Sequence, residues 1–518
     1  MALRRAAALA ALFLCCTVLP AAAQDVTLTS QDGSIEISGT LLGFDGEFYR
    51  VDTRFGTLTV DSSGVTCDGP GCPNLQDFVA EIVFSGSSTM AEVLLPALVE
   101  GFAMRSGHQF TRHPRDEAHF DYELVAPGTG KIVARFLFRV TNTDEGFADL
   151  LADEADLAMA LREIRPAERA RAREIGLGDL TQPGRSRVLA LDAMVPVVAP
   201  DNPVREISAT QLARVYAGEI SNWSDLGGPD APIALHLPVE GSGLAQAAED
   251  TLLRPARLTL APGVIRHARS SQLVDAVVKD PIGIGLASFA ETGTARVLPL
   301  TGGCGFALSA TRRAIKTEDY PLTSPMFLYQ PARRLPKMGR AFLSYVTSPA
   351  AQFVIRRAGF VDQAPEQIGL GLQGDRFANA IAAAGKEVTL AELQRMTAVL
   401  KPMERLTYTF RFEPGSARPD AQSRTNISLL AEAIEAGTFD AHTLVFVGFS
   451  DGDGPAGSNM RIARARAEAV RNAVAKAAET AAKRIDTHVE AFGEALPMAC
   501  DDSDWGRKIN RRVEVWLR

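Results

Sequence analysis

Short runs of alternating apolar and polar residues occupy the chain from residue 25 to residue 76. The runs VTLTS, SIEISGTLLGF, EFYRVDT and TLTVDSS are separated by Asp-Gly and Phe-Gly pairs, which are typical of tight turns. The two-residue period predicts strands, and their close spacing predicts a small all-β module over residues 25–76. The module carries no chemically suggestive motif, so we expect it to have a structural or protein-contact role.

Beyond residue 79, apolar strands alternate with amphipathic stretches of helix length. EIVFSGSST precedes MAEVLLPALVEGFAMRSG, and RVLALDAMVPVVAP precedes SATQLARVYAGE. This alternation predicts α/β units on mostly parallel sheets. Because the stretch is long and lacks a nucleotide-binding fingerprint, it fits two lobes with a cleft between them over residues 79–361. Residues 362–404 are interpreted as a polar connection that contains one helix. Thr389 is its predicted N-cap, and Glu392 three residues later completes the pattern of a capping box.

The last part of the chain, residues 405–518, predicts an α+β domain with two opposite charges at one edge. TLVFVGFSD (443–451) has the pattern of a buried strand, and the residues from 459 to 482 are rich in helix formers. Asp451 therefore closes a strand, and Arg466 lies two turns into the next helix. A carboxylate and a guanidinium across a shallow groove suit a zwitterion such as a free amino acid end. An ordinary internal salt bridge would use the same two residues.

These residues resemble the OmpA C-terminal-like peptidoglycan-binding domain. The resemblance rests on Gly448 to Asp451, on the helix from Asn459 to Val470, and on the ending NRRVE. It implies that Asp451 and Arg466 hold the free amino acid end of diaminopimelate in the peptide stem of peptidoglycan. The site residues that the resemblance implies are Ser450, Asp451, Asn459, Arg466, Asn510 and Arg512. Phe449 and Ser450 depart from the usual His and Thr and leave the charged pair intact.

The N-terminus and the cysteines indicate an oxidising compartment. Arg4 and Arg5 precede an apolar run and an A-x-A site, which predicts a signal peptide over residues 1–24. A lipid anchor at Cys15 or Cys16 is not favoured, because bulky Leu14 precedes Cys15. Cys67 and Cys72 flank a Gly-Pro-Gly turn and are expected to form a disulfide; Cys304 and Cys500 are left open.

The charge of the mature chain argues against nucleic acid as a partner. The formal net charge of -8 becomes -10 once the signal peptide, with its two arginines and no acid, is removed. A mild acidic excess without a basic tract does not suit a polyphosphate backbone. The predicted signal peptide and the resemblance to peptidoglycan-binding domains imply a periplasmic protein attached to the cell wall, with an outer-membrane association left open.

The middle region resembles the periplasmic phosphate-binding proteins of Pst-type ABC transporters, which have a type II two-lobed fold. The resemblance rests on FSGSSTM (84–90), ADLAMALRE (155–163), ALDAMVPVVAPDNPV (190–204), GEISNWSDLGG (218–228) and EGSGL (240–244). Two of these segments place Ser88 and Thr89, and Ser242 and Gly243, at predicted helix starts. Helix starts offer free N–H donors to an anion, although Ser and Thr also simply cap helices. The anion-binding residues predicted here are Ser88, Thr89, Thr143, Arg162, Ser242 and Gly243.

Three positions depart from the phosphate-binding pattern. Leu161 stands where a carboxylate is expected, Pro238 where an arginine is expected, and Leu244 where a threonine is expected. Arg162 is the candidate replacement for the missing positive charge, unless its side chain points to solvent. The ligand is therefore phosphate, another oxyanion, a larger organic phosphate or nothing held tightly.

The sequence contains no recognisable catalytic constellation, and we expect no enzyme activity and no cofactor. His108, His113 and His119 have spacings that fit no helical metal site, so a polar loop is predicted there and no metal. The leading hypothesis is a solute-binding protein for phosphate or a related oxyanion, anchored to peptidoglycan, with an ABC permease as an open partner. The alternative is an envelope structural, adhesion or sensor protein whose fold has lost its ligand, and a phosphate-ester enzyme ranks third.

Overall fold

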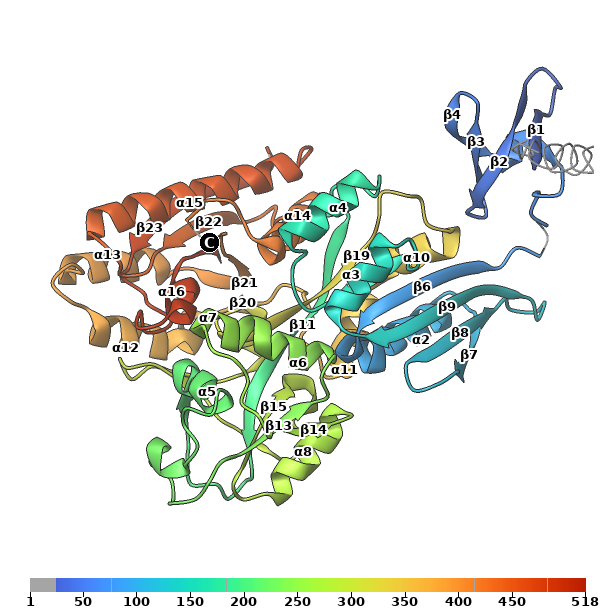
Figure 1. Ribbon diagram of the computed structural model, residues 1–518. Coiled ribbons are helices and arrows are strands. Elements are labelled where there is room, and N and C mark those ends of the chain that lie inside the picture. Colours follow the sequence, from blue (N-terminus) through green and yellow to red (C-terminus); the bar gives the residue numbers. More distant parts are fainter. Residues whose placement is uncertain (1–24, 76, 183, 414, 482) are drawn as a thin grey trace, which may run out of the picture.

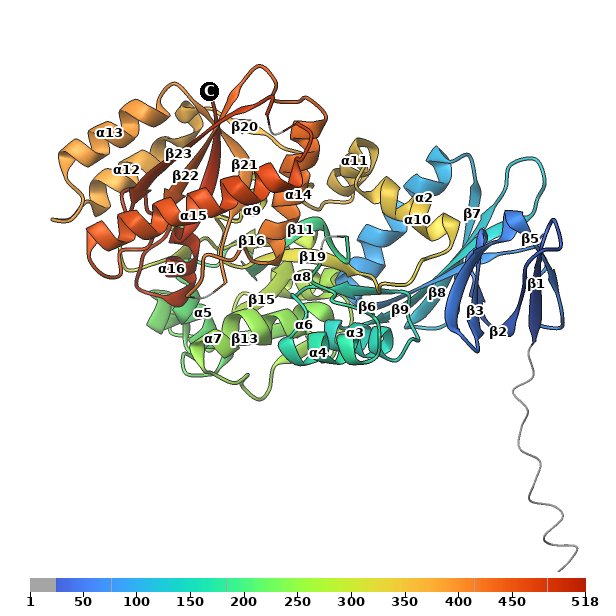
Figure 2. The same cartoon turned by 90° about the horizontal axis from the view of Figure 1, so that it is seen from above.

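The structure is a computed structural model that describes residues 25–75, 77–182, 184–413, 415–481 and 483–518. The predicted signal peptide, with Cys15 and Cys16, lies outside the described residues. Figures 1 and 2 place an N-terminal β module and a C-terminal domain at opposite ends of a two-lobed middle domain. Within the described ranges, no helix is long and apolar enough to cross a bilayer.

The N-terminal module is a five-stranded antiparallel sheet in the order β4-β3-β2-β1-β5. Its small core includes Leu28, Tyr49 and Val51. The predicted disulfide between Cys67 and Cys72 is present and ties β5 to the loop that follows it. The elements are β1 (Val26–Ser30), β2 (Glu36–Phe44), β3 (Phe48–Thr53), β4 (Gly56–Asp61), the turn η1 (Ser62–Gly64) and β5 (Val65–Asp68).

One mixed sheet of eleven strands runs through the middle domain, in the order β14-β13-β15-β11-β19-β10-β6-β9-β8-β7 with β16 beside β11. The long strand β11 pairs with β19 over its first part and with β15 over its last part, so it passes from one lobe into the other. Because β11 and β19 are antiparallel and β7 to β9 form an antiparallel meander, the prediction of mostly parallel sheets is wrong. Apolar runs indicate burial but carry no strand direction. The strands are β6 (Ala80–Ser87), β7 (Gln109–Pro114), β8 (His119–Val125), β9 (Ile132–Thr141), β10 (Leu157–Ala160), β11 (Ser186–Val198), β13 (Ala234–Pro238), β14 (Ile265–His267), β15 (Gly283–Ser288), β16 (Arg296–Val297) and β19 (Thr323–Tyr329).

Helices divide the middle domain into two lobes with separate hydrophobic cores. In the first lobe, α2, α10 and α11 pack against β6 to β9, and in the second lobe α5, α6 and α8 pack around β13 and β15. A small sheet, β12-β17-β18, completes the second lobe. The first lobe contains η2 (Met90–Leu94), α2 (Leu95–Arg105), α3 (Thr143–Leu151), α4 (Pro166–Glu174), α10 (Lys337–Val346) and α11 (Pro349–Arg357). The second lobe contains β12 (Ile207–Ser208), α5 (Ala209–Tyr216), η3 (Trp223–Leu226), α6 (Gly243–Ala248), η4 (Glu249–Leu253), α7 (Arg254–Ala256), α8 (Ser270–Lys279), η5 (Phe289–Glu291), β17 (Leu300–Thr301), β18 (Ala307–Leu308) and α9 (Arg312–Lys316).

The histidine-rich segment is a β-hairpin rather than the predicted polar loop. His113 lies in β7 and His119 in β8, where they face Glu123 and Asp116 respectively. The sequence pattern hid the strands because β7 is mostly exposed and charged residues interrupt the mostly buried β8. Among the described residues, no group of three or more His, Cys, Asp or Glu is arranged to hold a metal ion.

The C-terminal domain is a five-stranded sheet, β20-β21-β24-β22-β23, with helices on both faces. Leu444 and Phe446 of β22 pack with α14 and α15, whereas Val445 and Val447 pack with α13. The segment 362–404 is thus more than a connection, since it supplies an edge strand and the cover of the second face. Its helix begins at the predicted N-cap Thr389, which accepts a hydrogen bond from the backbone N–H of Glu392. The elements are β20 (Gln367–Ile368), η6 (Leu370–Gln373), α12 (Gly374–Ala383), α13 (Leu390–Leu400), β21 (Glu404–Phe410), α14 (Ala421–Glu435), β22 (Thr443–Phe449), α15 (Ala456–Ala477), β23 (Asp486–Gly493), α16 (Asp504–Asn510) and β24 (Arg512–Leu517).

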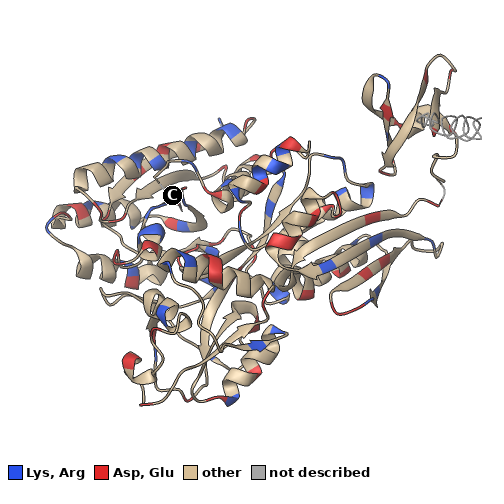
Figure 3. Cartoon of the chain, viewed as in Figure 1, with Lys and Arg blue, Asp and Glu red and all other residues tan. Residues whose placement is uncertain are grey.

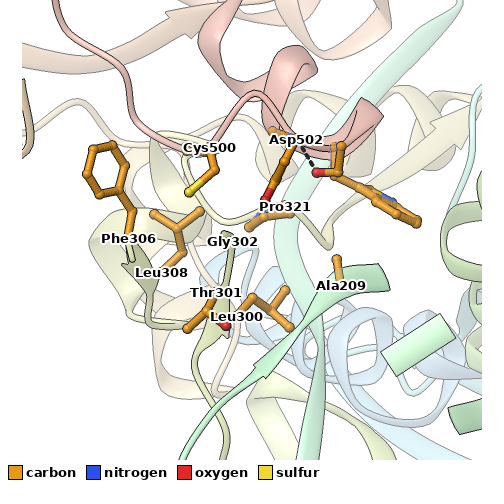
Figure 4. A pocket seen from close by; sticks show the side chains of 13 residues that line it. Ala209, Leu300, Thr301, Gly302, Phe306, Leu308, Pro321, Cys500 and Asp502 are labelled. Carbon is orange, nitrogen blue, oxygen red and sulfur yellow. Dashed lines mark hydrogen bonds between the residues drawn. The ribbon is translucent and has the colours of Figure 1, made fainter. Parts of the chain in front are cut away.

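The C-terminal domain is fastened to the second lobe by covalent and ionic contacts. A disulfide joins Cys304 to Cys500, and Figure 4 shows Cys500 and Asp502 facing Leu300, Phe306 and Leu308 across the pocket beside it.

Buried charges lie close to this disulfide along the same interface. Asp319 of the second lobe accepts hydrogen bonds from Arg405 at 2.8 Å and from Arg411 at 3.4 Å, and all three side chains are buried. On the other side of the domain, Arg424 pairs with Glu163 of the first lobe. The domain therefore contacts both lobes.

Candidate functional site

The first candidate site lies at the carboxyl end of β22, where the helix α15 crosses close to the strand. A Cβ atom on Gly448 would lie 2.1 Å from the carbonyl oxygen of Ala463, so only glycine permits this approach. Arg466 follows Ala463 by one helical turn, and Asp451 follows β22 by two residues. Close packing of strand and helix thus brings the predicted charged pair to one edge of the sheet.

Arg466 is a buried cation without a close partner among the described residues. No hydrogen bond or ion pair reaches its guanidinium there, and its Nε is buried without a hydrogen bond. Its guanidinium lies 5.1 Å from the ring centre of Phe412. Burial and the neighbouring Arg511 lower the pKa of Arg466, and the carboxylate of Asp451 acts in the opposite direction. A carboxylate ligand would relieve the cost of burying this charge.

Asp451 is paired with Arg511 rather than with Arg466. Nη1 of Arg511 donates to Oδ2 of Asp451 at 2.5 Å, and the side chain of Arg511 is 32% exposed. Sequence reasoning missed Arg511 as a site residue. The alternation of a strand could have indicated it, since Arg512 faces inward and its neighbour must face outward.

Further carboxylates surround Asp451. Asp501 accepts a hydrogen bond from the N–H of Gly452 at 2.8 Å, and Glu494 accepts one from Asn459 Nδ2 at 2.9 Å. Burial raises the pKa of Glu494, and the nearby carboxylates, Asp451 among them, raise it further. The site therefore has an acidic side suited to an ammonium group and a basic side suited to a carboxylate. Glu494 and Asp501 lie on the loop after β23, and no motif in that loop indicated them.

Two of the other predicted residues, Asn510 and Arg512, support the site from within. Asn510 is fully buried: its Oδ1 accepts from the N–H of Met498 at 2.7 Å, and its Nδ2 donates to Asp501 at 2.8 Å. Arg512 is also fully buried and donates to Glu514 at 2.7 Å and to the carbonyl of Leu496 at 2.9 Å. Both side chains are engaged in internal contacts that position the loop and strand of the site, and a direct contact with a ligand stays a prediction for them.

Ser450 and Asn459 lie next to the charged residues of the site but make no ionic contact with them. The hydroxyl of Ser450 is buried without a hydrogen-bond partner, beside the end of β22. Asn459 donates to the carbonyl of Gly454 at 3.3 Å and so fixes the loop that follows Asp451. Both shape the pocket edge rather than extend into it.

The second candidate site lies between the lobes, where β6 and α6 meet. Ser87 ends β6, and a Cβ atom on Gly243 would lie 2.4 Å from its hydroxyl oxygen. This hydroxyl is buried and has no hydrogen-bond partner. Ser242 caps α6 through a hydrogen bond to its Oγ from the N–H of Ala245 at 3.3 Å. Ser88 and Thr89, half-buried at the first turn after β6, lie at the same junction.

Internal contacts already use several donors and acceptors of this cleft. Thr143 Oγ1 accepts from the N–H of Leu161 at 3.1 Å, and the N–H of Thr143 donates to Gln246 Oε1 at 3.1 Å. The side chain of Leu161 lies 3.2 Å from the position of a Cβ on Gly243, so it fills the place of the missing carboxylate. Gln246 was not predicted, although its position one turn after Gly243 places it on the same helix face.

Arg162 does not supply a free positive charge to the cleft. Its guanidinium is paired with Asp144, with Glu168 at 2.6 Å and with Asp250 at 3.9 Å. It also lies 5.0 Å from the ring centre of Phe147. These carboxylates neutralise it, so the prediction of Arg162 as a substitute anion ligand is wrong.

Two lobes joined by crossing strands, with helix starts converging between them, have the architecture of a bilobal binding protein, and a five-stranded sheet domain with a buried arginine near several carboxylates follows them. A family model described as "PBP superfamily domain" matches residues 72–350, which is more than half of the chain, and one described as "OmpA family" matches residues 411–511. The chain belongs to the PBP superfamily and carries an OmpA-family domain at its C-terminal end.

Individual relatives match the middle domain. Protein SphX of Synechococcus elongatus is 25% identical over 234 residues, covering 43% of this chain and 67% of its own. The phosphate-binding protein PstS of Borreliella burgdorferi is 22% identical over 200 residues, covering 37% of this chain and 70% of its own. PstS of Staphylococcus aureus strain USA300 is 24% identical over 330 residues, covering 62% and 89%.

Solved structures show similar chains for both parts. An ABC-type phosphate transport receptor from Vibrio cholerae has a TM-score of 0.41 and 20% identity, covering 54% of this chain and 99% of its own. A peptidoglycan-associated lipoprotein from Burkholderia pseudomallei has a TM-score of 0.19 and 18% identity, covering 21% of this chain and 89% of its own.

Proposed function

We propose that this protein is a periplasmic binding protein held non-covalently on peptidoglycan by its C-terminal domain. The observation that carries the proposal is the buried, unpaired guanidinium of Arg466 beside the carboxylates around Asp451. The free amino acid end of a diaminopimelate stem peptide carries one carboxylate and one ammonium. Its carboxylate would pair with Arg466, and its ammonium would bind at Asp451.

The ion pair between Arg511 and Asp451 is compatible with such a ligand. Arg511 is partly exposed and can turn to solvent, and an ammonium that takes its place keeps the buried carboxylate of Asp451 paired. An arriving ammonium can therefore share or displace this contact at little cost. Phe412 gives Arg466 an aromatic surface that holds the guanidinium in position for a carboxylate.

Sedimentation of the mature protein with purified sacculi tests the anchoring proposal. Loss of Arg466 or Asp451 by substitution with alanine is expected to weaken binding ~10- to 100-fold, because hydrogen bonds to charged groups contribute ~1.5–3 kcal/mol. Arg461→Ala removes an exposed arginine from the same helix and is the matched control. If folded Arg466→Ala protein sediments as strongly as the parent, the anchoring proposal is wrong.

For the cleft between the lobes, we propose phosphate or a related oxyanion as ligand. Support comes from the unpartnered hydroxyl of Ser87 at the point where two helix starts converge, and from the phosphate-binding names of the relatives. Without a free arginine, the ligand would be held by neutral donors. Calorimetric titration of the full chain with phosphate and sulfate tests this, with Gly243→Val as the variant that blocks the cleft.

A second candidate function follows from the internal contacts of the same cleft. Thr143 is already used by Leu161 and Gln246, and Arg162 is neutralised by carboxylates. These observations favour an envelope structural, adhesion or sensor protein whose fold no longer binds phosphate. No heat and no thermal stabilisation by any oxyanion would select this function over the first.

We propose a binding role rather than catalysis, as in the relatives, which are named as binding proteins. A protein fixed to the wall is poorly suited to shuttle a ligand to an ABC permease, so sensing, storage or presentation suits the anchored form better. Hydrolysis of a phosphate ester by the purified protein would overturn the non-enzymatic assignment.

A further inference from the structure

A polar pocket of about 490 Å³ lies beside α10, near the β module and away from both sites described above. Five arginines line it, Arg185, Arg187, Arg333, Arg334 and Arg340, and no aspartate or glutamate does. The chain as a whole has a net charge of -8, and Figure 3 shows acidic and basic residues interspersed over most elements. A lining whose charged groups are all guanidinium groups is therefore a local departure, and we call this cavity the arginine pocket.

Two of these arginines have most of their donors unused by the described residues. Nη1 of Arg185 donates to the carbonyl of Pro331 at 2.8 Å, and Nη1 of Arg187 donates to the carbonyl of Leu343 at 3.0 Å. Neither has an ion pair among the described residues. A guanidinium carries five N–H donors, so both can bind an anion without losing these contacts. Burial lowers the pKa of Arg187, which an anion in the pocket would counteract.

The β module holds two further arginines in place at the rim. Arg334 donates to Asp45 at 2.7 Å and to Glu47 at 2.9 Å, and Arg340 reaches the same two carboxylates. Asp45 and Glu47 lie outside the pocket lining. They hold both guanidinium groups at the rim, and each guanidinium has further N–H donors beyond these contacts. This gives the β module a role that its sequence did not indicate.

A neighbouring cavity of about 430 Å³ continues from the pocket along the module and shares Arg333 and Arg334 with it. Leu42, Phe44 and Phe48 of the module line it, and the guanidinium of Arg334 lies 4.4 Å from the ring centre of Phe48. The two cavities together present cations next to apolar and aromatic surface, and the lining of the second also contains Asp45 and Asp156, which pair with Arg334 and Arg333. This combination suits an anionic group attached to a larger body such as a sugar ring.

We propose that the arginine pocket binds an oxyanion with several phosphate or carboxylate groups, and that the β module completes the site. Phosphorylated and uronic-acid-containing glycans share this chemistry. The proposal is independent of ligand binding between the lobes, because the two places have no residue in common.

Calorimetry of the full mature chain tests the proposal with two probes, inorganic tripolyphosphate and trigalacturonate. At least one probe is expected to bind, and the double substitution Arg185→Gln with Arg187→Gln is expected to weaken it by at least ~10-fold, since each charge-assisted hydrogen bond is strong. Thr347→Trp, which fills the exposed mouth of the pocket and keeps all five arginines, is expected to weaken it as well. The preferred probe distinguishes a phosphate source from a carboxylate source.

Two controls separate this site from general charge and from the cleft. Arg171→Gln with Arg214→Gln removes two exposed arginines of the lobes, and Gly243→Val blocks the cleft. Both are expected to leave probe binding unchanged. No binding of either probe, or equal losses in the double variant and in a control, would overturn the proposal. Thermal unfolding of each variant identifies any loss that arises from misfolding.

Discussion

Glu318 is a buried acid at the interface between the second lobe and the C-terminal domain, and its replacement by glutamine should change how stability depends on pH. Its Oε1 has no hydrogen-bond partner, and Asp319 and Asp420 lie nearby. Burial, reinforced by Asp420, raises the pKa of Glu318 to about 8 from an ordinary value of 4.5. The folded protein therefore keeps this side chain protonated at neutral pH, whereas the unfolded chain ionises it.

The size of the effect follows from this difference. For a carboxyl whose pKa is raised by folding, stability is fully present below pH 4.5 and is lost as the pH rises to about 8. At about pH 7.5 the pH lies about three units above the unfolded-state pKa, and each unit corresponds to ~1.4 kcal/mol. Glu318 thus costs ~4 kcal/mol there, which Glu318→Gln removes. The backbone of residue 318 has a φ angle of 55°, in the left-handed region, and this backbone strain is the same with glutamate and with glutamine.

Urea unfolding of parent and Glu318→Gln protein between pH 5 and pH 8 measures this prediction. The variant should gain stability relative to the parent as the pH rises, and the two should converge near pH 5. A buried amide also costs free energy, but that cost is the same at every pH. A difference between the two proteins that stays constant across the range would refute the reasoning.

Three other changes test features of the structure. Cys304→Ser opens a covalent loop of sequence separation 196, so thermal unfolding should report a loss of about 5 kcal/mol on the chain-entropy scale; because both proteins keep the Cys67–Cys72 disulfide, a reducing agent should destabilise the parent by about that much more than the variant. Asp319→Ala removes the carboxylate that buried Arg405 and Arg411 share and leaves Arg405 with Glu514 at 3.4 Å, so it should cost ~3–5 kcal/mol by chemical denaturation; a loss below ~1 kcal/mol would show that the charges are solvated. Gly448→Ala forces α15 away from β22 and should cost ~1–3 kcal/mol together with most binding to sacculi, whereas unchanged sedimentation would separate this contact from the site.

Much of the architecture could be predicted from local patterns. The run TLVFVGFSD became β22, which ends at Phe449, and Thr389 caps a helix as expected. Both depend on neighbours along the chain. The antiparallel crossing of β11 and β19 could not be predicted, because strand direction depends on the connection between distant segments.

The sites were predictable to the extent that backbone position decides them. Asp451 and Arg466 fall at one edge because a strand end and a helix turn put them there. The direction of a long side chain is decided by tertiary neighbours instead, so Arg162 turned to acids of α3 and α4, and Arg512 turned inward. The pairing of Cys304 with a cysteine of another domain depends on docking, which no local pattern records.

The firm attachment of the C-terminal domain to both lobes has a mechanical consequence. A wall anchor joined by a flexible leash would let the rest of the molecule tumble freely. In this protein three contacts restrict motion between the C-terminal domain and the lobes. They are the disulfide, the buried ionic contacts and the Arg424–Glu163 pair. With the C-terminal domain bound to peptidoglycan as proposed, the arginine pocket would keep a fixed orientation and distance relative to the wall.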